Sequence, residues 1–189
     1  SRKAAPYTID ADGFGGLLMN SRSRLYRLDP GRPGQATRVQ LISRGTLLAA
    51  GGRRVLLWDC NSPENCSLML VDQRTRHRVG RPAAARTLQA KNGIGTNPNN
   101  YGDVALSPDG THLAVMANDQ AGAFRVHVID LRTGKGALLP GAGIDSNVNR
   151  QLAWSPNSRW LLALTDQQVR GYDTRTHTTS SVPLGSEPL

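Results

Sequence analysis

The feature that most constrains the fold of this chain is a short motif that occurs four times along it. Each copy is an alternating run that ends in an aspartate, and the four aspartates are Asp29, Asp72, Asp130 and Asp173. They are separated by 43, 58 and 43 residues. In the last three copies a threonine follows at the third place: Thr75, Thr133 and Thr176. A repeat of this length, made of runs too short for ordinary helices, predicts an array of similar small sheets.

The stretch from Asp103 to Pro140 contains one complete unit of this array. Four short apolar runs are separated by residues that favour turns. Pro108 fixes φ for a turn and Gly110 tolerates positive φ, so the first two runs are expected to form a hairpin. We therefore predict an all-β fold in which each unit is a four-stranded antiparallel sheet. The predicted units of a single domain spanning residues 1–189 are 7–42, 43–82, 102–141 and 148–185, with an insertion at 83–101.

Two hairpin sequences resemble the repeat of TolB-like and related WD-type β-propellers. They are Ser107-Pro-Asp-Gly-Thr-His-Leu-Ala-Val and Trp154-Ser-Pro-Asn-Ser-Arg-Trp-Leu-Leu-Ala. The resemblance implies that the Ser-Pro-Asp-Gly stretch joins the innermost strand of a blade to the next strand. It also implies that the Asp-x-x-Thr stretch joins the third strand to the fourth. About four blades are expected, either as a small closed ring or as part of a larger propeller.

Composition narrows the class of protein. No segment has the apolar length of a membrane helix and no secretory signal is visible, although the start at Ser1 without Met leaves an upstream membrane anchor open. The net charge of +9 comes almost entirely from arginines scattered through turns. This pattern lacks the basic stripe and interleaved aromatic residues of a specific nucleic-acid site. Weak attraction to an anionic polymer is still expected.

Cys60 and Cys66 are the two cysteines of the chain, and they enclose a segment with Pro63 and two asparagines. Such a segment is expected to turn sharply and to bring the sulfur atoms within bridging distance. A metal or redox pair is the alternative, but the spacing is not Cys-x-x-Cys and no second ligand pair is present. A loop disulfide is favoured, which favours an extracytoplasmic compartment in turn.

The conspicuous aspartates are interpreted as turn residues and not as catalytic groups or metal ligands. A carboxylate at a strand end can accept backbone N–H bonds from its own turn, and a threonine three residues later can do the same. The residues predicted to have this structural role are Asp29, Asp72, Asp109, Asp130, Thr133 and Asp173. No catalytic, metal-binding or cofactor-binding motif is visible in the sequence.

The insertion is the segment in which we look for binding, because loops on a rigid scaffold often carry contacts. The predicted contact residues are Asn97, Asn99, Asn100 and Tyr101. The leading hypothesis is a non-catalytic, extracytoplasmic propeller scaffold for a protein or polymer partner. The alternatives are an accessory or gating propeller of a hydrolase or lyase and the sensor domain of a membrane-anchored protein. The identity of the partner and the oligomeric state do not follow from the sequence.

Overall fold

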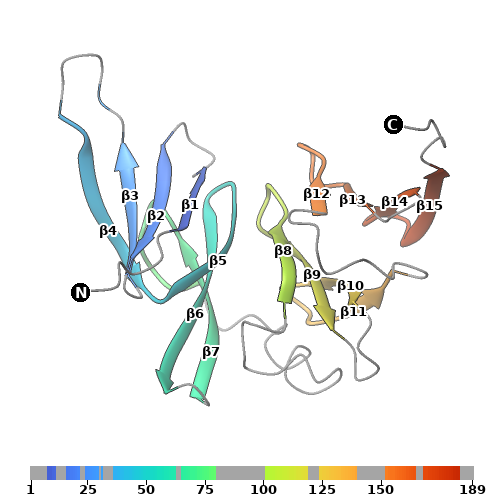
Figure 1. Ribbon diagram of the computed structural model, residues 1–189, viewed down its shortest axis with the longest axis horizontal. Coiled ribbons are helices and arrows are strands. Elements are labelled where there is room, and N and C mark those ends of the chain that lie inside the picture. Colours follow the sequence, from blue (N-terminus) through green and yellow to red (C-terminus); the bar gives the residue numbers. More distant parts are fainter. Residues whose placement is uncertain are drawn as a thin grey trace, which may run out of the picture.

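A computed structural model of the chain consists of β-strands joined by turns and connections (Figure 1). The structure describes residues 8–11, 16–21, 24–29, 31, 36–62, 65–79, 101–118, 124–139, 152–164 and 168–183. Over these ranges the fold is all-β, as predicted. A search of the same ranges finds no helix long and apolar enough to cross a membrane.

The strands form four antiparallel sheets, which we call blades 1 to 4 in chain order. Blade 1 contains β1 (Thr8–Ala11), β2 (Leu17–Ser21), β3 (Arg24–Asp29) and β4 (Arg38–Arg44). Blade 2 contains β5 (Thr46–Gly51), β6 (Arg54–Ser62) and β7 (Asn65–Asp72). Blade 3 contains β8 (Tyr101–Leu106), β9 (His112–Asn118), β10 (Phe124–Asp130) and β11 (Gly136–Leu138). Blade 4 contains β12 (Leu152–Trp154), β13 (Trp160–Leu164), β14 (Gln168–Asp173) and β15 (Thr178–Pro183).

Blade 2 differs from the prediction at its outer edge. Each unit was expected to have four strands, but the described residues of blade 2 form three. After β7 the described residues up to 79 make an isolated antiparallel bridge, between Val71 and Arg78. Arg76 has a positive φ of 62°, and the side chains of the segment are exposed. An edge segment that buries no apolar side chain has little to stabilise a longer ladder.

Two further boundaries differ from the predicted ones. Tyr101 was assigned to the insertion, yet it is the first residue of β8 and pairs with Ala117. The segment between the cysteines was expected to be a loop, yet β6 and β7 extend into it and pair Ser62 with Asn65. Both differences arise because backbone pairing continues past the last apolar residue of a run.

The first strands of the blades lie at the narrow inner edge of the stack. Among contacts between different blades, the most extensive are those of β5 with β8 and of β8 with β12. From β1, β5, β8 and β12 each blade continues outward in sequence order. This is the arrangement that the propeller resemblance implies, with the Ser107 to Gly110 turn joining an innermost strand to the second strand.

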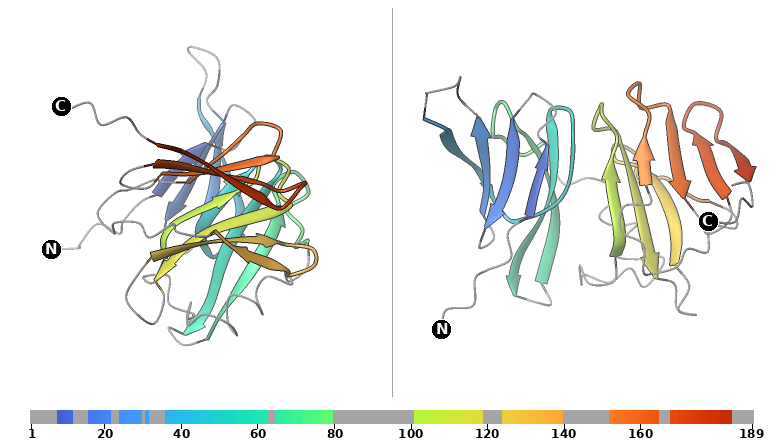
Figure 2. Two further views of the ribbon diagram at one scale, coloured as in Figure 1. Left: turned by 90° about the vertical axis from the view of Figure 1, so that its right-hand side faces the viewer. Right: turned by 45° about the horizontal axis from the view of Figure 1, so that its top comes forward.

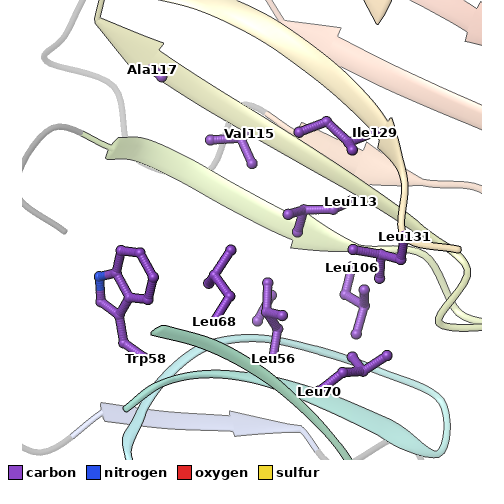
Figure 3. Close-up of a cluster of buried hydrophobic side chains, with 11 residues drawn as sticks. Leu56, Trp58, Leu68, Leu70, Leu106, Leu113, Val115, Ala117, Ile129 and Leu131 are labelled. Carbon is purple, nitrogen blue, oxygen red and sulfur yellow. The ribbon is translucent and has the colours of Figure 1, made fainter. Parts of the chain in front are cut away.

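Among the described residues the buried hydrophobic side chains form three clusters, each lying between two consecutive blades. One joins blades 1 and 2 and includes Leu18, Val55 and Leu57. A second joins blades 2 and 3, where Leu56, Trp58 and Leu68 face Leu106 and Leu113 (Figure 3). A third joins blades 3 and 4. Each buried Leu, Val or Met side chain contributes roughly 1.5–3 kcal/mol, so the blades are held together chiefly by these faces.

Blades 1 and 4 lie at opposite ends of the stack (Figures 1 and 2). Each of the three clusters joins neighbours in the sequence, and none made by the described residues joins blade 4 to blade 1. The four blades therefore form an open arc. Of the two predicted arrangements, a small closed ring is not what the described residues form.

Candidate functional site

The stack has two ends with different chemistry. What we call the turn end carries the hairpin turns 51–53, 107–111 and 155–159 together with the Asp-x-x-Thr turns. What we call the connection end carries the starts of the inner strands, including Tyr101 and Leu152, and the tip of the β6–β7 hairpin. Figures 1 and 2 show the hairpin turns of blades 2 and 3 together at one end and the β6–β7 tip at the other.

In the hairpin turn of blade 3, Asp109 is held by its own turn. The Asp109 Oδ1 atom accepts hydrogen bonds from the Ser107 hydroxyl at 2.6 Å and from the Thr111 hydroxyl at 2.8 Å. It also accepts the Thr111 backbone N–H at 2.9 Å. Burial raises the pKa of this carboxyl, but the Ser107 and Thr111 hydrogen bonds outweigh it and the net shift is downward. These bonds stabilise the turn and use the carboxylate within it.

The equivalent turn of blade 4 has Asn157 and Ser158 where blade 3 has Asp109 and Gly110. The Ser155 hydroxyl lies 2.7 Å from Asn157 Oδ1, which reproduces the first hydrogen bond of blade 3. Ser158 has a positive φ of 60°, close to the 67° of Gly110. Its hydroxyl accepts the backbone N–H of Asp109 at 2.9 Å and so joins the turns of two blades. The serine thus adds an inter-blade hydrogen bond in a conformation that usually favours glycine.

The turn of blade 2 packs against the turn of blade 3 in a similar way. A Cβ atom added at Gly51 would collide with the carbonyl oxygen of Ser107, and one added at Gly52 would collide with that of Pro108. The Arg54 guanidinium donates to the carbonyl oxygen of Gly110 at 2.8 Å. Consecutive hairpin turns therefore contact one another along the turn end, and glycine is required at the closest approach.

The Asp-x-x-Thr turns repeat one hydrogen-bond pattern. Oδ1 of Asp72, Asp130 and Asp173 accepts the backbone N–H groups of the second and third residues that follow. At Asp72 the Thr75 N–H is the largest cause of a lowered pKa. At Asp130 burial raises the pKa, but the N–H groups of Thr133 and Arg132 reverse the shift.

Asp173 is the most strongly held carboxylate of this set. Its side chain is 2% exposed, and Arg159 Nη2 lies 2.7 Å from its Oδ2 atom. The Arg159 hydrogen bonds lower the pKa of Asp173 to about 2, with smaller contributions from the Arg175 and Thr176 N–H groups. Asp29 is in a different setting, because its carboxylate forms an ion pair with Arg27 on the same strand at 2.8 Å.

A small cavity of about 210 Å³ lies between the outer parts of blades 3 and 4. Its polar lining includes His112, Asp130, Lys135, Tyr172 and His177. The Tyr172 hydroxyl lies 2.9 Å from His177 Nδ1, and burial is the main cause of the raised pKa of this tyrosine. Either the phenol or the imidazole can donate in this contact, according to the tautomer of His177. The cavity could hold a few waters or a small polar group.

The imidazole of His112 and the Asp130 carboxylate at this cavity already have structural partners. His112 Nδ1 lies 2.8 Å from the Thr111 hydroxyl oxygen, and Asp130 accepts its turn N–H groups. Over the described ranges, no group of three or more His, Cys, Asp and Glu side chains is placed to hold a metal ion. The His112, Asp130, Tyr172 and His177 side chains at the cavity are therefore all hydrogen-bonded to other groups of the protein.

At the connection end, Asn97, Asn99 and Asn100 lie outside the described residues, and of Tyr101 only the backbone is described. Asp103, the third residue of β8, accepts two backbone hydrogen bonds. Its Oδ1 atom accepts the Val104 N–H and its Oδ2 atom accepts the Leu152 N–H of blade 4, both at 2.9 Å. Asp103 thus joins two inner strands. In addition, Trp154 Nε1 of blade 4 donates a hydrogen bond to the Ala105 carbonyl oxygen of blade 3 at 3.1 Å.

Sequence reasoning did not find these inter-blade roles of Asp103 and Ser158. The partners of both lie 49 residues away in the chain. The sequence offered one signal for each: Asp103 directly precedes the apolar run from Val104 to Leu106, and Ser158 occupies a glycine position of the hairpin turn.

Comparison with solved structures identifies the architecture. The chain matches part of a chain in the mitotic checkpoint complex, with 16% identity and a TM-score of 0.53, over 99% of this chain and 54% of that one. A match to the nidogen/laminin complex has 12% identity and a TM-score of 0.52, and covers 88% of this chain and 60% of the other. The fold is a β-propeller.

Another similar propeller is the extracellular domain of a putative one-component system from B. thetaiotaomicron. It has 11% identity and a TM-score of 0.53 over 95% of this chain and 24% of that chain. No protein-family model and no curated protein sequence matches the chain. In each of these three matches the chain spans less than two thirds of the similar protein's length. At such identities the likeness concerns the fold and leaves function to be argued from the residues.

Proposed function

We propose that this propeller is a non-catalytic, extracytoplasmic scaffold that binds a protein partner at its connection end. The proposed contact residues are Asn97, Asn99, Asn100 and Tyr101. The observation that carries the proposal is the position of β8. It begins at Tyr101 and contacts both β5 and β12, so the first described residue after the connection lies on a strand that packs against the inner strands of both neighbouring blades.

The length of this connection supports a role beyond joining two blades. Gly45 alone links β4 of blade 1 to β5 of blade 2. The corresponding link from blade 2 to blade 3 comprises residues 80–100. A scaffold that can join blades through one residue does not need so long a segment for folding. Long connections on rigid scaffolds are common places for binding contacts.

The turn end supports the non-catalytic part of the proposal. The carboxylates of Asp72, Asp109, Asp130 and Asp173 accept hydrogen bonds within their own turns, and Asp173 is also paired with Arg159. Groups held in this way stabilise turns and are poorly available for acid–base chemistry. The net charge of +9 adds a preference for acidic partner surfaces.

The cysteine pair supports an extracytoplasmic location. Cys60 and Cys66 are direct Cα partners in the β6–β7 ladder. Opposed residues of an antiparallel pair have Cα atoms about 4.5–5.5 Å apart, within the range that a disulfide spans. Their side chains lie outside the described residues, so the bridge itself stays a prediction. Intact mass measured with and without reductant tests it: loss of two hydrogens in the unreduced protein is expected, and equal masses would contradict it.

The binding proposal is tested by comparing variants at the two ends. Partners are captured from an extracytoplasmic extract with the wild-type chain, identified by mass spectrometry and then purified for affinity measurement. Alanine at Asn97, Asn99, Asn100 and Tyr101 is expected to weaken binding at least about tenfold, which is about 1.4 kcal/mol. The matched control carries alanine at three exposed turn-end residues, Arg74, Arg132 and Arg175, and is expected to bind within about twofold of wild type.

Two results would count against the proposal. Equal affinity of the wild type and the connection-end variant would remove these four residues from the interface. Binding that is lost mainly in the turn-end control, and that weakens steeply with salt for any polyanion, would instead indicate non-specific attraction to the basic surface.

A further inference from the structure

The second strands of the four blades differ in burial in a way that singles out the two ends of the arc. In blade 3, the five consecutive residues of β9 from Leu113 to Ala117 are all buried. In blade 2, the four residues of β6 from Val55 to Trp58 are all buried. By contrast, β2 of blade 1 and β13 of blade 4 alternate, with Leu17 43% exposed and Leu162 and Leu164 43% and 39% exposed. Blades 1 and 4 each have one covered and one uncovered face.

The uncovered face of blade 4 is equivalent, position by position, to a face that is covered in blade 3. The Cα pairing of Leu162 with Gly171 and of Leu164 with Val169 matches that of Ala114 with Val128 and of Met116 with Val126. In blade 3 these positions form the cluster with blade 4 and are at most 3% exposed. Blade 4 therefore presents the face that a following blade would cover.

The uncovered face of blade 1 is equivalent to a covered face of blade 2. Leu17 pairs with Leu28 and Met19 pairs with Tyr26, in the register of Val55 with Val71 and of Leu57 with Met69. The four residues in blade 2 are at most 4% exposed and pack against blade 1. Val39 and Leu41 continue the blade 1 face on β4 at 58% and 46% exposure. Blade 1 presents the face that a preceding blade would cover.

The residue types on these faces indicate that each is normally covered. A strand with one face in water usually alternates apolar and polar residues. β13 instead reads Trp-Leu-Leu-Ala-Leu, which is typical of a strand buried on both faces. Single exposed apolar residues on an outermost strand are ordinary, but a group on a second strand forms a patch of the kind that marks an interface.

We propose that both end faces are blade–blade interfaces of a larger closed propeller, and that further blades of the same polypeptide cover them. Each of the three existing interfaces joins blades that follow one another in the sequence, which favours chain-adjacent blades over a second copy as the occupants. The two solved propellers described first are matched over 54% and 60% of their length, which fits a ring somewhat less than twice the size of this arc. This inference concerns the architecture and does not depend on the proposed partner.

The test compares the 189-residue chain with the product of the full reading frame from which it comes. The first variant is Leu162→Asp, and the control is Ser181→Asp, an exposed residue of β15 whose Cα partner, Arg170, is not on the proposed interface. Leu162→Asp is expected to lower the Tm of the full-length protein by about 10 °C because it buries a charge, and that of the 189-residue chain by less than about 2 °C. The control is expected to change neither by more than about 2 °C.

Thiol accessibility provides a second measurement if the aspartate variant does not fold. Cysteine at Leu162 is expected to react with a thiol reagent about a hundredfold more slowly in the full-length protein than in the 189-residue chain. Cysteine at Ser181 should react rapidly in both. Peptide mapping separates these sites from Cys60 and Cys66.

Three results would overturn the proposal. The first is a full reading frame that encodes no further units of short strands and turns. The second is equal reactivity of the Leu162 cysteine in both proteins. The third is a 189-residue chain that sedimentation shows to be a discrete dimer, dissociated by Leu162→Asp, since the occupant would then be a second copy.

Discussion

Blades 3 and 4 are built from nearly the same sequence pattern, yet they are in different environments. Both have a Ser-Pro turn after the inner strand and an Asp-x-x-Thr turn after the third strand. Blade 3 is covered on both faces, whereas blade 4 is covered on one. Strand pattern and turn chemistry therefore specify a blade. The contribution of each apolar residue to the free energy of unfolding depends on whether a neighbouring blade covers it.

The largest expected difference between the two blades is in the loss of stability on alanine substitution at the equivalent residues Met116 and Leu164. Met116 is 1% exposed and Leu164 is 39% exposed. Met116→Ala should lower the free energy of unfolding by about 3 kcal/mol because it leaves a cavity, and Leu164→Ala by less than about 1 kcal/mol. Chemical denaturation of the two variants measures the difference. Similar losses would mean that the face of blade 4 that carries Leu162 and Leu164 is already covered in the 189-residue chain.

The hairpin turns should give the next largest effect. In blade 3, Gly110→Ala adds a Cβ to a residue at φ 67°, where the nearest atom is Arg54 Cδ at 2.5 Å, and should cost about 2 kcal/mol. In blade 4, Ser158→Ala keeps the Cβ but removes the acceptor of the Asp109 N–H, and should cost about 1–2 kcal/mol. Thermal unfolding measures both. A neutral Ser158→Ala would show that water replaces the hydroxyl and that the turns are not coupled.

A smaller effect is expected at the junction between the inner strands of the two blades. Trp154→Phe removes the indole N–H that reaches the Ala105 carbonyl oxygen while keeping most of the ring's contact. We expect a loss of about 1 kcal/mol in the free energy of unfolding. Trp160→Phe is the matched control, because its partly buried ring lies beside Arg159, with the guanidinium carbon 5.4 Å from the ring centroid. If both changes have the same effect, the Trp154 hydrogen bond adds nothing to the junction.

The smallest expected effect is a pH dependence that is larger in blade 4 than in blade 3. The pKa of Asp173 is lowered to about 2 by Arg159, below its ordinary value of 3.8, whereas that of Asp130 is lowered mainly by two backbone N–H groups against the effect of burial. A lowered carboxyl pKa stabilises the fold above the unfolded value, and this stabilisation is lost as the pH falls through the folded value.

The Tm should therefore decrease between about pH 4 and pH 2, and Asp173→Asn should flatten this decrease more than Asp130→Asn does. Because Arg159 is partly exposed, solvent and salt screening should keep the difference modest. The measurement is the Tm as a function of pH for the wild type and the two variants. Parallel curves for all three would show that neither carboxylate contributes to the acid sensitivity.

The strands and turns of blades 3 and 4 were predictable because they depend on local chemistry. The Ser107 to Gly110 turn was predicted from a fixed φ at Pro108 and a permitted positive φ at Gly110, and Gly110 has φ 67°. The apolar run around Trp58 likewise forms a strand, and Trp58 is 2% exposed in the core between blades 2 and 3. The fourth strand expected in blade 2 does not form among the described residues, because residues 76–79 follow the Asp72-x-x-Thr75 turn but bury no side chain.

The candidate site could be predicted only in part. That a long connection lies before blade 3 follows from the spacing of the aspartates, which is 58 residues instead of 43 at that point. That β8, the strand after this connection, contacts both β5 and β12 depends on packing between blades. The cavity that brings His112 together with Tyr172 and His177 likewise joins residues of two blades, and no local pattern encodes such a meeting.

Local residues specify the repeating unit, which has short alternating runs, turns at Ser-Pro and Asp-x-x-Thr, and a repeat of about one blade's length. These properties follow from backbone geometry and hydrogen bonding within a few residues. Three other features depend on packing between units: the open arc, the joining of blades by Asp103 and Ser158, and the position of Leu17 and Leu162 on uncovered faces. The reason is physical: burial and inter-blade hydrogen bonds depend on neighbours more than forty residues away, which the local sequence does not specify.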